Sequence, residues 1–280
     1  MGEKNWAVYA SAGMVDYYSR INLLQPAEKT ILELLRDRLP TMDMLDIGIG
    51  GGRTTQHFLP LVGSYTGIDY AAGMVTACRR RFSQASPSIH LAVVDARDMG
   101  LFADNSFDFI LFSFNGIDYV SHGDRIRILQ EIHRVGKPGC CVLFSSHNLQ
   151  HIAGTFDYRH HLSRNPLKAY ENLAMWGVLR LFNRSVSRAH IGAANYLVLR
   201  DESHNFRLQT YYIRPQEQVK QLAFGFGRIE IYSWQRGTRL GAADDEAAES
   251  DAWLYYFCVV NDRPKIYDQP PVALAFAKPG

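Results

Sequence analysis

The amino-acid sequence predicts an α/β protein with a doubly wound, mostly parallel sheet of seven strands. Two patterns carry this prediction. Short apolar segments with strand character alternate with amphipathic segments of helical spacing over most of the chain. A cluster of glycines directly follows the first of these strands, a position where Rossmann-like folds turn sharply into a helix. The 280 residues, 47% of them hydrophobic, are enough to build a full core.

The first strand is expected within residues 41–48, and Arg53 to Leu61 is expected to form a helix that starts at the glycine turn. Further strands are expected at 64–70, 88–95, 106–115 and 139–148, with helices between them at 71–82 and 122–135. After residue 148 the rhythm changes: a segment rich in His, Arg, Tyr and Trp precedes two strands at 195–200 and 206–214. The alternation then resumes with a helix at 215–226 and strands at 228–234 and 252–260. A parallel sheet with helices on both faces and an insertion between the fifth strand and the last helix follows from this order.

The composition narrows the class of protein. The net charge of +2 gives no electrostatic argument for nucleic acid as a partner. The four cysteines lack Cys-x-x-Cys spacing, so neither a zinc site nor a disulfide framework is indicated, and a reducing compartment suits them. No segment has the pattern of a signal peptide or the roughly 18 apolar residues of a membrane span. We therefore expect a cytoplasmic protein, and the sequence leaves a homodimer open.

The glycine turn indicates a nucleotide site. Gly48, Gly50, Gly51 and Gly52 let the backbone approach a ligand closely, and the helix that follows would present free N–H groups. The dinucleotide fingerprint Gly-x-Gly-x-x-Gly fails, because its third position holds Arg53. No Tyr-x-x-x-Lys pair of a short-chain reductase is present. The pattern that fits is Asp-x-Gly-x-Gly-x-Gly, beginning at Asp46.

This pattern resembles class I S-adenosylmethionine-dependent methyltransferases, closely over residues 42–148 and loosely over the last 65. The resemblance implies S-adenosylmethionine as cofactor, Asp69 as the ligand of its ribose hydroxyls and Asp95 as the ligand of its adenine amino group. Asp69 lies 23 residues after Asp46, at the end of the second strand. One departure is Cys140, at a position where the family more often has glycine. The cofactor-binding residues that the resemblance implies are Asp46, Gly48, Gly50, Gly52, Asp69, Tyr70, Asp95, Ala96, Arg97, Phe114 and Asn115.

Each of these residues has a simpler explanation when taken alone. Asp46 or Asp69 could cap the following helix, and Asp95 could be a turn residue at a strand end. The order of four such signals along the chain favours the cofactor site.

The chemistry needs few protein groups, because the sulfonium already activates the methyl group and the protein must align a nucleophile and exclude water. His147, after the fifth strand, and His122, after the fourth, are the candidate general bases, although loop histidines often only cap or face solvent. Tyr18 is a third candidate catalytic residue. No cluster has metal-ligand spacing, so no metal is predicted.

The acceptor is expected to contact the N-terminal helix and the insertion. The segment "DYYSR" at 16–20 and the segment at 204–215 are similar to parts of small-molecule N-methyltransferases, such as glycine N-methyltransferase and sugar amino-methyltransferases. Tyr17, Tyr211 and Tyr212 are the candidate substrate residues, through ring faces or hydroxyls. Neighbouring tyrosines on a strand face opposite sides, so packing explains one of each pair equally well. The basic, aromatic segment 156–185 could bind an anionic substrate or a membrane surface, or form a helical lid.

These inferences divide the chain into four parts: N-terminal helices and the cofactor-binding half at 1–148, a substrate cap at 149–214, the completing helix and strands at 215–262, and a tail at 263–280. Residues 241–250 and the tail are expected to be flexible surface. The leading function is methyl transfer to nitrogen or oxygen of a small metabolite. A nucleic-acid methyltransferase is the first alternative, although the fourth strand lacks an Asn-Pro-Pro-Tyr motif. A non-catalytic cofactor-binding protein of the same fold is the second.

Overall fold

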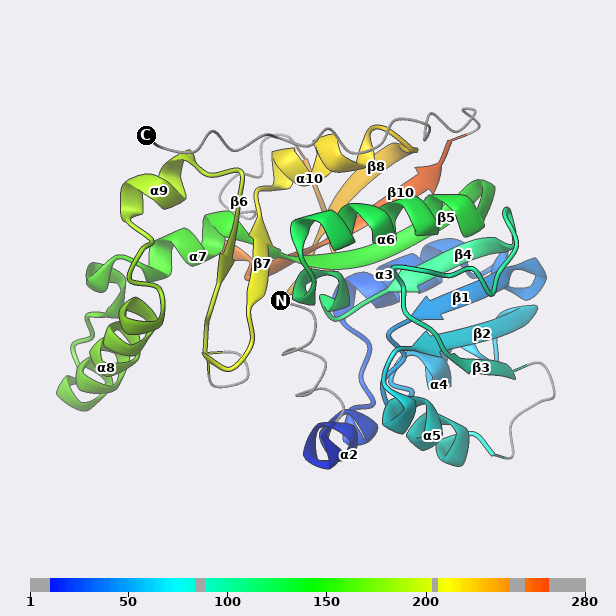
Figure 1. The fold of residues 1–280 in the computed structure, drawn as a ribbon, viewed down its shortest axis with the longest axis horizontal. Coiled ribbons are helices and arrows are strands. Elements are labelled where there is room, and N and C mark those ends of the chain that lie inside the picture. Colours follow the sequence, from blue (N-terminus) through cyan, green and yellow to red (C-terminus); the bar gives the residue numbers. More distant parts are fainter. Residues whose placement is uncertain (1–10, 84–88, 203–205, 242–249, 262–280) are drawn as a thin grey trace, which may run out of the picture.

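A computed structural model of the chain describes residues 11–83, 89–202, 206–241 and 250–261 (Figure 1). The two segments that the sequence marks as flexible surface, 241–250 and the tail, lie outside these residues except for Gly241 and Ser250. A twisted sheet runs through the middle of the molecule, with helices on both faces and an elongated insertion at one end.

One sheet contains all the strands of the described residues. Its main path has the order β3-β2-β1-β4-β5-β10-β8-β9, in which β1 to β5 run parallel and β10 is antiparallel to β5 and to β8. The fold class predicted from the sequence is therefore confirmed. The strands of this path are β1 (Asp43–Ile47), β2 (Ser64–Asp69), β3 (Ile89–Val93), β4 (Phe107–Phe112), β5 (Gly136–Asn148), β8 (Phe226–Ser233), β9 (Arg239–Leu240) and β10 (Trp253–Val260).

The insertion adds two strands to the same sheet. β6 (Tyr196–Leu199) and β7 (Thr210–Ile213) pair antiparallel, and β7 pairs parallel with the last two residues of β5. His147 faces Tyr212 across this pairing and faces Trp253 of β10 on the other side. The sheet thus forks at the end of β5, so the strand count exceeds the predicted seven. β7 is shorter than the predicted strand 206–214, because Phe206 to Gln209 follow an irregular path.

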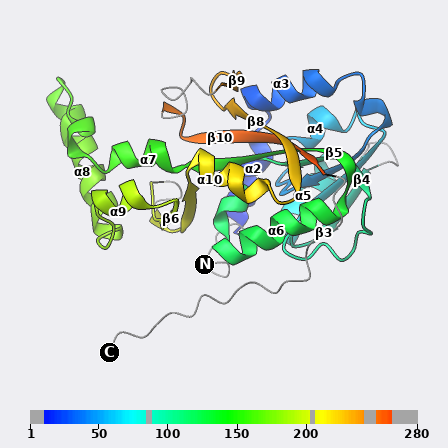
Figure 2. The ribbon, with the colours of Figure 1, turned by 90° about the horizontal axis from the view of Figure 1, so that it is seen from above.

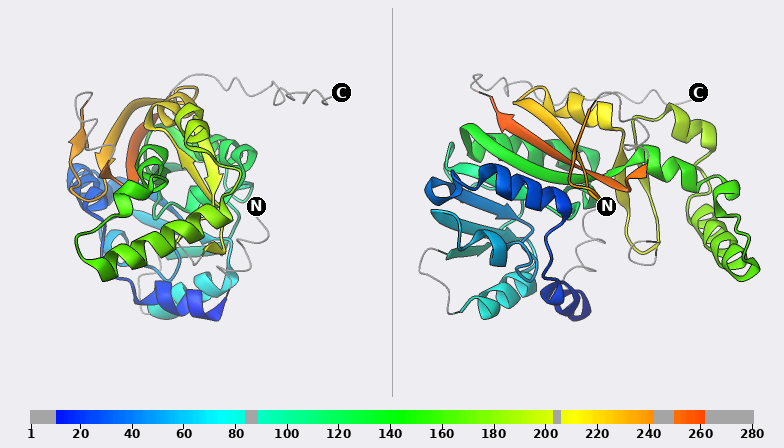
Figure 3. Two further views of the ribbon diagram at one scale, coloured as in Figure 1. Left: turned by 90° about the vertical axis from the view of Figure 1, so that its left-hand side faces the viewer. Right: turned by 180° about the vertical axis from the view of Figure 1, so that it is seen from behind.

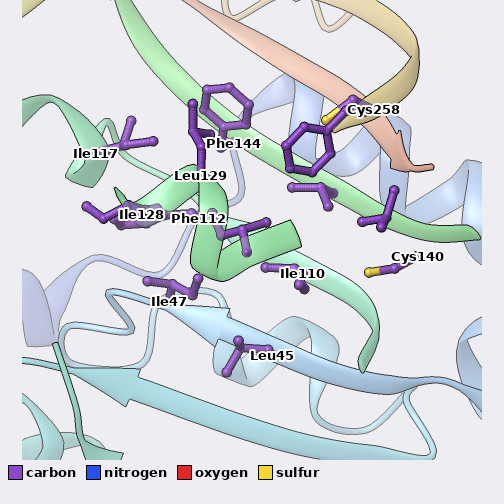
Figure 4. Close-up of a cluster of buried hydrophobic side chains, with 14 of the residues drawn as sticks. Leu45, Ile47, Ile110, Phe112, Ile117, Ile128, Leu129, Cys140, Phe144 and Cys258 are labelled. Carbon is purple, nitrogen blue, oxygen red and sulfur yellow. The ribbon is translucent and has the colours of Figure 1, made fainter. Parts of the chain in front are cut away.

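Helices pack on both faces of the sheet. α6 (His122–Val135) and α10 (Pro215–Leu222) lie in front of the sheet in Figure 1, and α3 (Pro26–Leu35) crosses its back, as the right-hand view of Figure 3 shows. α6 places Ile128, Leu129 and Ile132 against the front face at helical spacing, and Figure 4 shows the first two among the buried side chains there. A second cluster joins α3 to the back face.

The expected helix after the glycine turn is much shorter than predicted. α4 covers only Thr55–Phe58, and turns occupy the residues on either side of it. Pro60 accounts for the early end, because proline has no N–H to donate and restricts the residue before it. α2 (Ala12–Arg20) forms where the sequence predicts a helix, and it packs against α5 (Ala72–Arg81).

The insertion also has three α-helices and a small apolar cluster of its own. Leu149, Phe156, Leu179 and Ile191 are among the buried residues of this cluster. Figure 2 shows α8 at the far end of the molecule, away from the main sheet. The helices are α7 (Leu149–Thr155), α8 (Pro166–Phe182) and α9 (Arg188–Ala193). Short 3-10 helices among the described residues are η1 (Leu39–Thr41), η2 (Gly116–Tyr119) and η3 (Tyr158–His161). The predicted domain boundaries at 148 and 214 remain a prediction.

Candidate active site

A cavity lies at the carboxyl ends of β1, β2 and β4, the edge where open α/β sheets bind ligands. Its volume is about 810 Å³ including its open mouth. It brings together residues that the sequence places more than 90 positions apart, from Tyr18 of α2 to Phe114 after β4. The lining residues are Tyr18, Ile47, Gly48, Gly50, Asp69, Tyr70, Met74, Val94, Asp95, Ala96, Phe112, Ser113, Phe114, Gly116, Tyr119, Val120 and Ile128.

The glycine turn forms the floor of this cavity. Gly50 has a φ of +52°, a backbone conformation that costs little only for residues without a Cβ. At Gly51 a Cβ would lie 2.4 Å from the Cα of Ser19, so α2 rests directly on the turn. The turn therefore needs glycine for two reasons, its own backbone conformation and the close approach of α2.

Asp69 joins the turn to the second strand. Its Oδ2 accepts the N–H of Gly50 at 3.0 Å, and its Oδ1 accepts the N–H of Ala71 at 2.8 Å. Burial raises the pKa of this carboxyl, although both backbone bonds oppose the shift. Each carboxylate oxygen has a further lone pair, so Asp69 keeps acceptor capacity towards the cavity that it lines.

Asp95 lies on the apolar side of the cavity, between Val94 and Ala96. Burial would raise the pKa of Asp95, but the hydrogen bonds and the positive charge of Arg97 outweigh burial and lower it. The Nη2 of Arg97 lies 2.7 Å from Oδ2 of Asp95. Arg97 itself does not line the cavity; its side chain is partly exposed beside Asp95 and Asp124.

Asp46 supports the turn from below. It is buried, and its Oδ2 accepts hydrogen bonds from the hydroxyls of Thr54 at 2.5 Å and Tyr65 at 2.6 Å. Burial raises the pKa of Asp46 to about 6. It lines a smaller neighbouring cavity together with Gly48 and Gly50. Gly52 lines neither cavity, and a Cβ there would lie 2.5 Å from the ring of Phe82.

The end of β4 has a strained backbone. Phe114 and Asn115 both have positive φ, 59° and 58°, which is uncommon for residues with a Cβ and costs about 1–3 kcal/mol each. The Asn115 N–H donates to Oγ of Ser145 at 2.8 Å, which helps to hold this conformation. Phe114 lines the cavity, whereas Asn115 is buried behind it with no partner for its Oδ1 among the described residues.

His147 belongs to a buried polar cluster behind Asn115. Its Nδ1 lies 2.7 Å from Oδ2 of Asp118, and the same oxygen accepts the backbone N–H of His147 at 2.6 Å. Arg125 and Ser146 both donate to the other oxygen of Asp118. The Nε2 of His147 lies 3.4 Å from Nδ2 of Asn115. His147 does not line the cavity. Tyr119 lines the cavity and also packs against His147, with ring centres 6.1 Å apart.

The other candidate base and the substrate tyrosines are placed elsewhere. His122 begins α6; its Nδ1 is 2.8 Å from the hydroxyl of Tyr211, and its ring stacks on Tyr196. Burial lowers the pKa of His122. Tyr212 is buried and donates to Asp201, while Tyr17 is 58% exposed. None of His122, Tyr17, Tyr211 and Tyr212 lines the cavity, whereas Tyr18 does.

Two groups of functional interest escaped the sequence analysis. Glu28 and Arg53 form a buried ion pair with two N–O distances of 2.6 Å, and Arg53 also lies over the ring of Phe114 at 4.5 Å. Burial raises the pKa of Glu28, but the charge of Arg53 together with hydrogen bonds from Arg53, Ser113 and the Gln25 N–H outweighs burial and lowers it. Asp118, the partner of His147, is the second. The sequence signal at Glu28 is weak: it stands three residues after Gln25, the spacing of a helix capping box, and this spacing does not indicate a buried ion pair.

The cavity fits the cofactor that the glycine motif implies. The spare lone pairs of Asp69 suit a diol, and the apolar strip of Met74, Val94, Ala96 and Ile128 next to Asp95 suits a flat purine. The described residues contain no group of three or more metal-ligating side chains.

Residues 44–139 match the family model described as "Methyltransferase domain". The matched segment starts in β1 and ends in β5, so it contains the glycine turn, Asp69, Asp95 and the strained end of β4. Residues 44–139 thus form a methyltransferase domain, and the chain is consistent with a class I methyltransferase. It is therefore an enzyme, and enzymes of this class take their methyl group from S-adenosylmethionine.

Solved structures of low sequence identity share the fold of this methyltransferase. The N-methyltransferase NodS from Bradyrhizobium japonicum WM9, in complex with S-adenosyl-l-homocysteine, is 13% identical, with a TM-score of 0.51 over 92% of this chain and 99% of that one. The 1,6-didemethyltoxoflavin-N1-methyltransferase from Burkholderia thailandensis is 12% identical, with a TM-score of 0.58 over 92% and 87%. An S-adenosylmethionine dependent methyltransferase from Mesorhizobium loti is 14% identical, with a TM-score of 0.56 over 83% and 97%. No curated protein sequence matches the methyltransferase.

Proposed function

We propose that this methyltransferase transfers the methyl group of S-adenosylmethionine to a nitrogen or oxygen atom of a small metabolite. The observation that carries the proposal is the cavity that joins Asp69 and Asp95 to Tyr18 and Phe114. Its carboxylates suit the nucleoside, and its aromatic end suits a small organic acceptor. The names of NodS and the toxoflavin enzyme, which are both N-methyltransferases, support a small nitrogen acceptor.

The residues that would hold the cofactor line the same cavity. Asp69 would accept hydrogen bonds from the ribose hydroxyls, and Asp95 from the adenine amino group, with Ala96 beside the ring. Gly48 and Gly50 leave room at the turn, and Phe114 would lie near the methionine end. When bound, the cofactor supplies an electrophilic methyl group on a positively charged sulfur.

His147 is the proton acceptor that we propose. The carboxylate of Asp118 can only accept, so the hydrogen of the neutral imidazole stays on Nδ1 and Nε2 keeps its lone pair. His147 lies behind Asn115 and Tyr119 rather than in the cavity wall, so an acceptor N–H or O–H would reach Nε2 by replacing the long 3.4 Å contact with Asn115. Asp118 is a positioning residue in this scheme, because it touches the acceptor only through His147.

Two measurements test the proposal. Titration calorimetry with S-adenosylhomocysteine tests the cofactor site, and we expect one site per chain. Transfer from radiolabelled S-adenosylmethionine into the low-mass fraction of a metabolite extract tests the reaction. Label that appears only in tRNA or DNA would point to the nucleic-acid alternative. Binding without transfer to any fraction would point to a non-catalytic protein.

The expectation of a cytoplasmic location is part of this proposal. All four cysteines are free and buried, which suits a reducing compartment. Within the described residues, no helix combines the length and the apolar character needed to cross a bilayer.

A further inference from the structure

The outward side of α8 is mostly apolar and exposed, with one acid, Glu171, among its apolar side chains. Tyr170 is 72% exposed, Leu167 is 66% exposed and Leu181 is 52% exposed, and Met175 and Phe182 are also exposed. At 100° per residue these side chains fall on one side of the helix. We call the residues Leu167, Tyr170, Ala174, Met175, Leu181 and Phe182 the outer face of α8.

The opposite side of α8 attaches the helix to the insertion. Leu179 is buried in the apolar cluster of the insertion, and Nε1 of Trp176 donates to the carbonyl of Phe156 at 3.3 Å. Phe182, at the end of the helix, also stacks on Phe206 of this cluster, with ring centres 5.2 Å apart. The other residues of the outer face are not members of the cluster. Helices that are apolar on both sides normally have a partner on each side, and exposed apolar patches of this kind mark interaction sites.

Positive charge surrounds the outer face. Residues 157–190 carry six Lys and Arg against two acids, although the whole chain is almost balanced at 30 against 28. Arg159, Arg164, Lys168 and Arg184 are exposed. Lys168 lies about two helical turns before Met175, so the two side chains are on the same edge of α8. Arg184 comes directly after the C-cap residue Asn183. A mostly apolar helix surface in a segment with an excess of Lys and Arg over acids complements an anionic lipid bilayer, and Glu171 is the one acid on that surface.

We propose that α8 docks the methyltransferase onto an anionic membrane surface, with the helix parallel to the bilayer and its outer face in the headgroup boundary. Figures 1 and 2 show α8 at the end of the molecule, where a flat surface can reach it without touching the main sheet. A symmetric dimer through the same face suits the charges less well, because it would bring the two basic rims together. The proposal does not depend on the identity of the methyl acceptor.

Vesicle sedimentation tests this proposal with the full chain. We expect the wild type to sediment with vesicles of one part phosphatidylglycerol to two parts phosphatidylcholine, to stay in solution with pure phosphatidylcholine, and to dissociate as salt rises. The variant Tyr170→Ser/Leu181→Ser should lose the binding. Lys168→Glu/Arg184→Glu should weaken it at least about tenfold, since each basic residue near such a surface contributes roughly fivefold.

Matched controls come from residues outside the insertion. Leu101→Ser changes a leucine that is 68% exposed, and Arg80→Glu reverses an exposed charge on α5; both should bind vesicles like the wild type. All variants should keep the wild-type affinity for S-adenosylhomocysteine, which shows that they are folded. Equal binding to neutral vesicles, or binding that survives Tyr170→Ser/Leu181→Ser, overturns the proposal. A vesicle-independent dimer in sedimentation velocity that the same pair of substitutions dissolves would assign the outer face to a second copy instead.

Discussion

Asp69 combines two tasks in one carboxylate, because it fixes the backbone at Gly50 and Ala71 and still faces the cavity. The first task makes the cavity a preformed site. The second makes Asp69 the residue whose removal should affect the nucleoside most directly.

Asp69→Ala should therefore weaken the binding of S-adenosylhomocysteine by about 1.5–3 kcal/mol, the usual size of hydrogen bonds to a charged group. Calorimetry measures this loss. Asp98→Ala is the control, because Asp98 follows β3 but is exposed and does not line the cavity. An unchanged affinity in a variant that keeps its thermal midpoint would remove Asp69 from the cofactor site.

The pairing of Asp118 with His147 predicts a defined tautomer. Nitrogen NMR of the wild type should show His147 with its hydrogen on Nδ1. In Asp118→Asn the amide can donate as well as accept, so this tautomer loses its preference and turnover should fall by about 10² or more.

Ser146→Ala is the control for this prediction, since it removes one donor to Asp118 without touching His147. It should lower stability but keep the tautomer. Asp118→Asn also takes the buried charge partner away from Arg125, which destabilises the fold. If this variant does not fold, the NMR spectrum of the wild type alone tests the tautomer of His147. A hydrogen on Nε2 in the wild type would contradict the role of His147 as a base.

At the scale of elements, the insertion separates into a part that belongs to the sheet and a part that projects from it. β7 pairs with β5 and is buried, so it cannot be removed without opening the sheet. The segment from η3 to the end of α8 contributes no residue to the cavity. Its two ends lie close together, because Nη2 of Arg188 is 3.0 Å from Oδ2 of Asp157.

Replacing residues 158–187 by a short Gly-Ser linker should leave S-adenosylhomocysteine binding within about twofold. If the acceptor is held by this part of the insertion, turnover should be lost. Calorimetry and methyl transfer measured on the same preparation distinguish the two effects. Full turnover in the shortened chain would place the acceptor between α2 and the end of β4.

The elements that followed from the sequence are those with strong local patterns. β1 and β4 are largely buried and apolar, and α6 has apolar residues at helical spacing. The length of α4 and the path before β7 were wrong or incomplete, because Pro60 and the irregular stretch at 206–209 break patterns that continue on either side. The fork of the sheet has no local signal, since it depends on pairing residues 147–148 with 212–213.

The same reasoning explains which site residues could be predicted. Asp69 ends β2 and Asp95 comes shortly after β3. Parallel strands bring their carboxyl ends to one edge of the sheet, so the positions of these residues in the sequence were enough to predict that they lie at the same edge. Asp118 and Glu28 function through partners 29 and 25 positions away, and nothing in the residues near them indicates those partners. The roles of all these residues in binding and catalysis remain predictions.

At the scale of the whole molecule, the buried carboxyls make stability depend on pH in opposite directions. Burial raises the pKa of Asp46 from 3.8 to about 6, so the folded protein binds more protons than the unfolded chain between these values. The contribution of Asp46 to stability therefore falls as pH rises through this window. Glu28, with its lowered pKa, contributes stability that is lost as pH falls below its unfolded value.

Asp46→Asn should remove the pH dependence that Asp46 contributes to stability and leave the contribution of Glu28 in place. The free energy of unfolding of the wild type, minus that of the variant, should fall by on the order of 2–3 kcal/mol between about pH 4 and pH 6. Urea unfolding at a series of pH values measures this difference. Lys137→Met, which disrupts a partly exposed ion pair with Asp108, provides a comparison and should show no such slope over the same range. A difference that stays constant or rises with pH would show that Asp46 is ionised in the folded protein.

The fork of the sheet joins the insertion to the main sheet at the proposed proton acceptor. β7 meets β5 at His147 and Asn148, so a tilt of the insertion bends the ladder at the proposed proton acceptor. Trp253 holds His147 from the other side, which leaves the histidine little freedom to move independently. If His147 is the proton acceptor, the placement of its ring depends on how the insertion sits, through two rungs of a β-ladder.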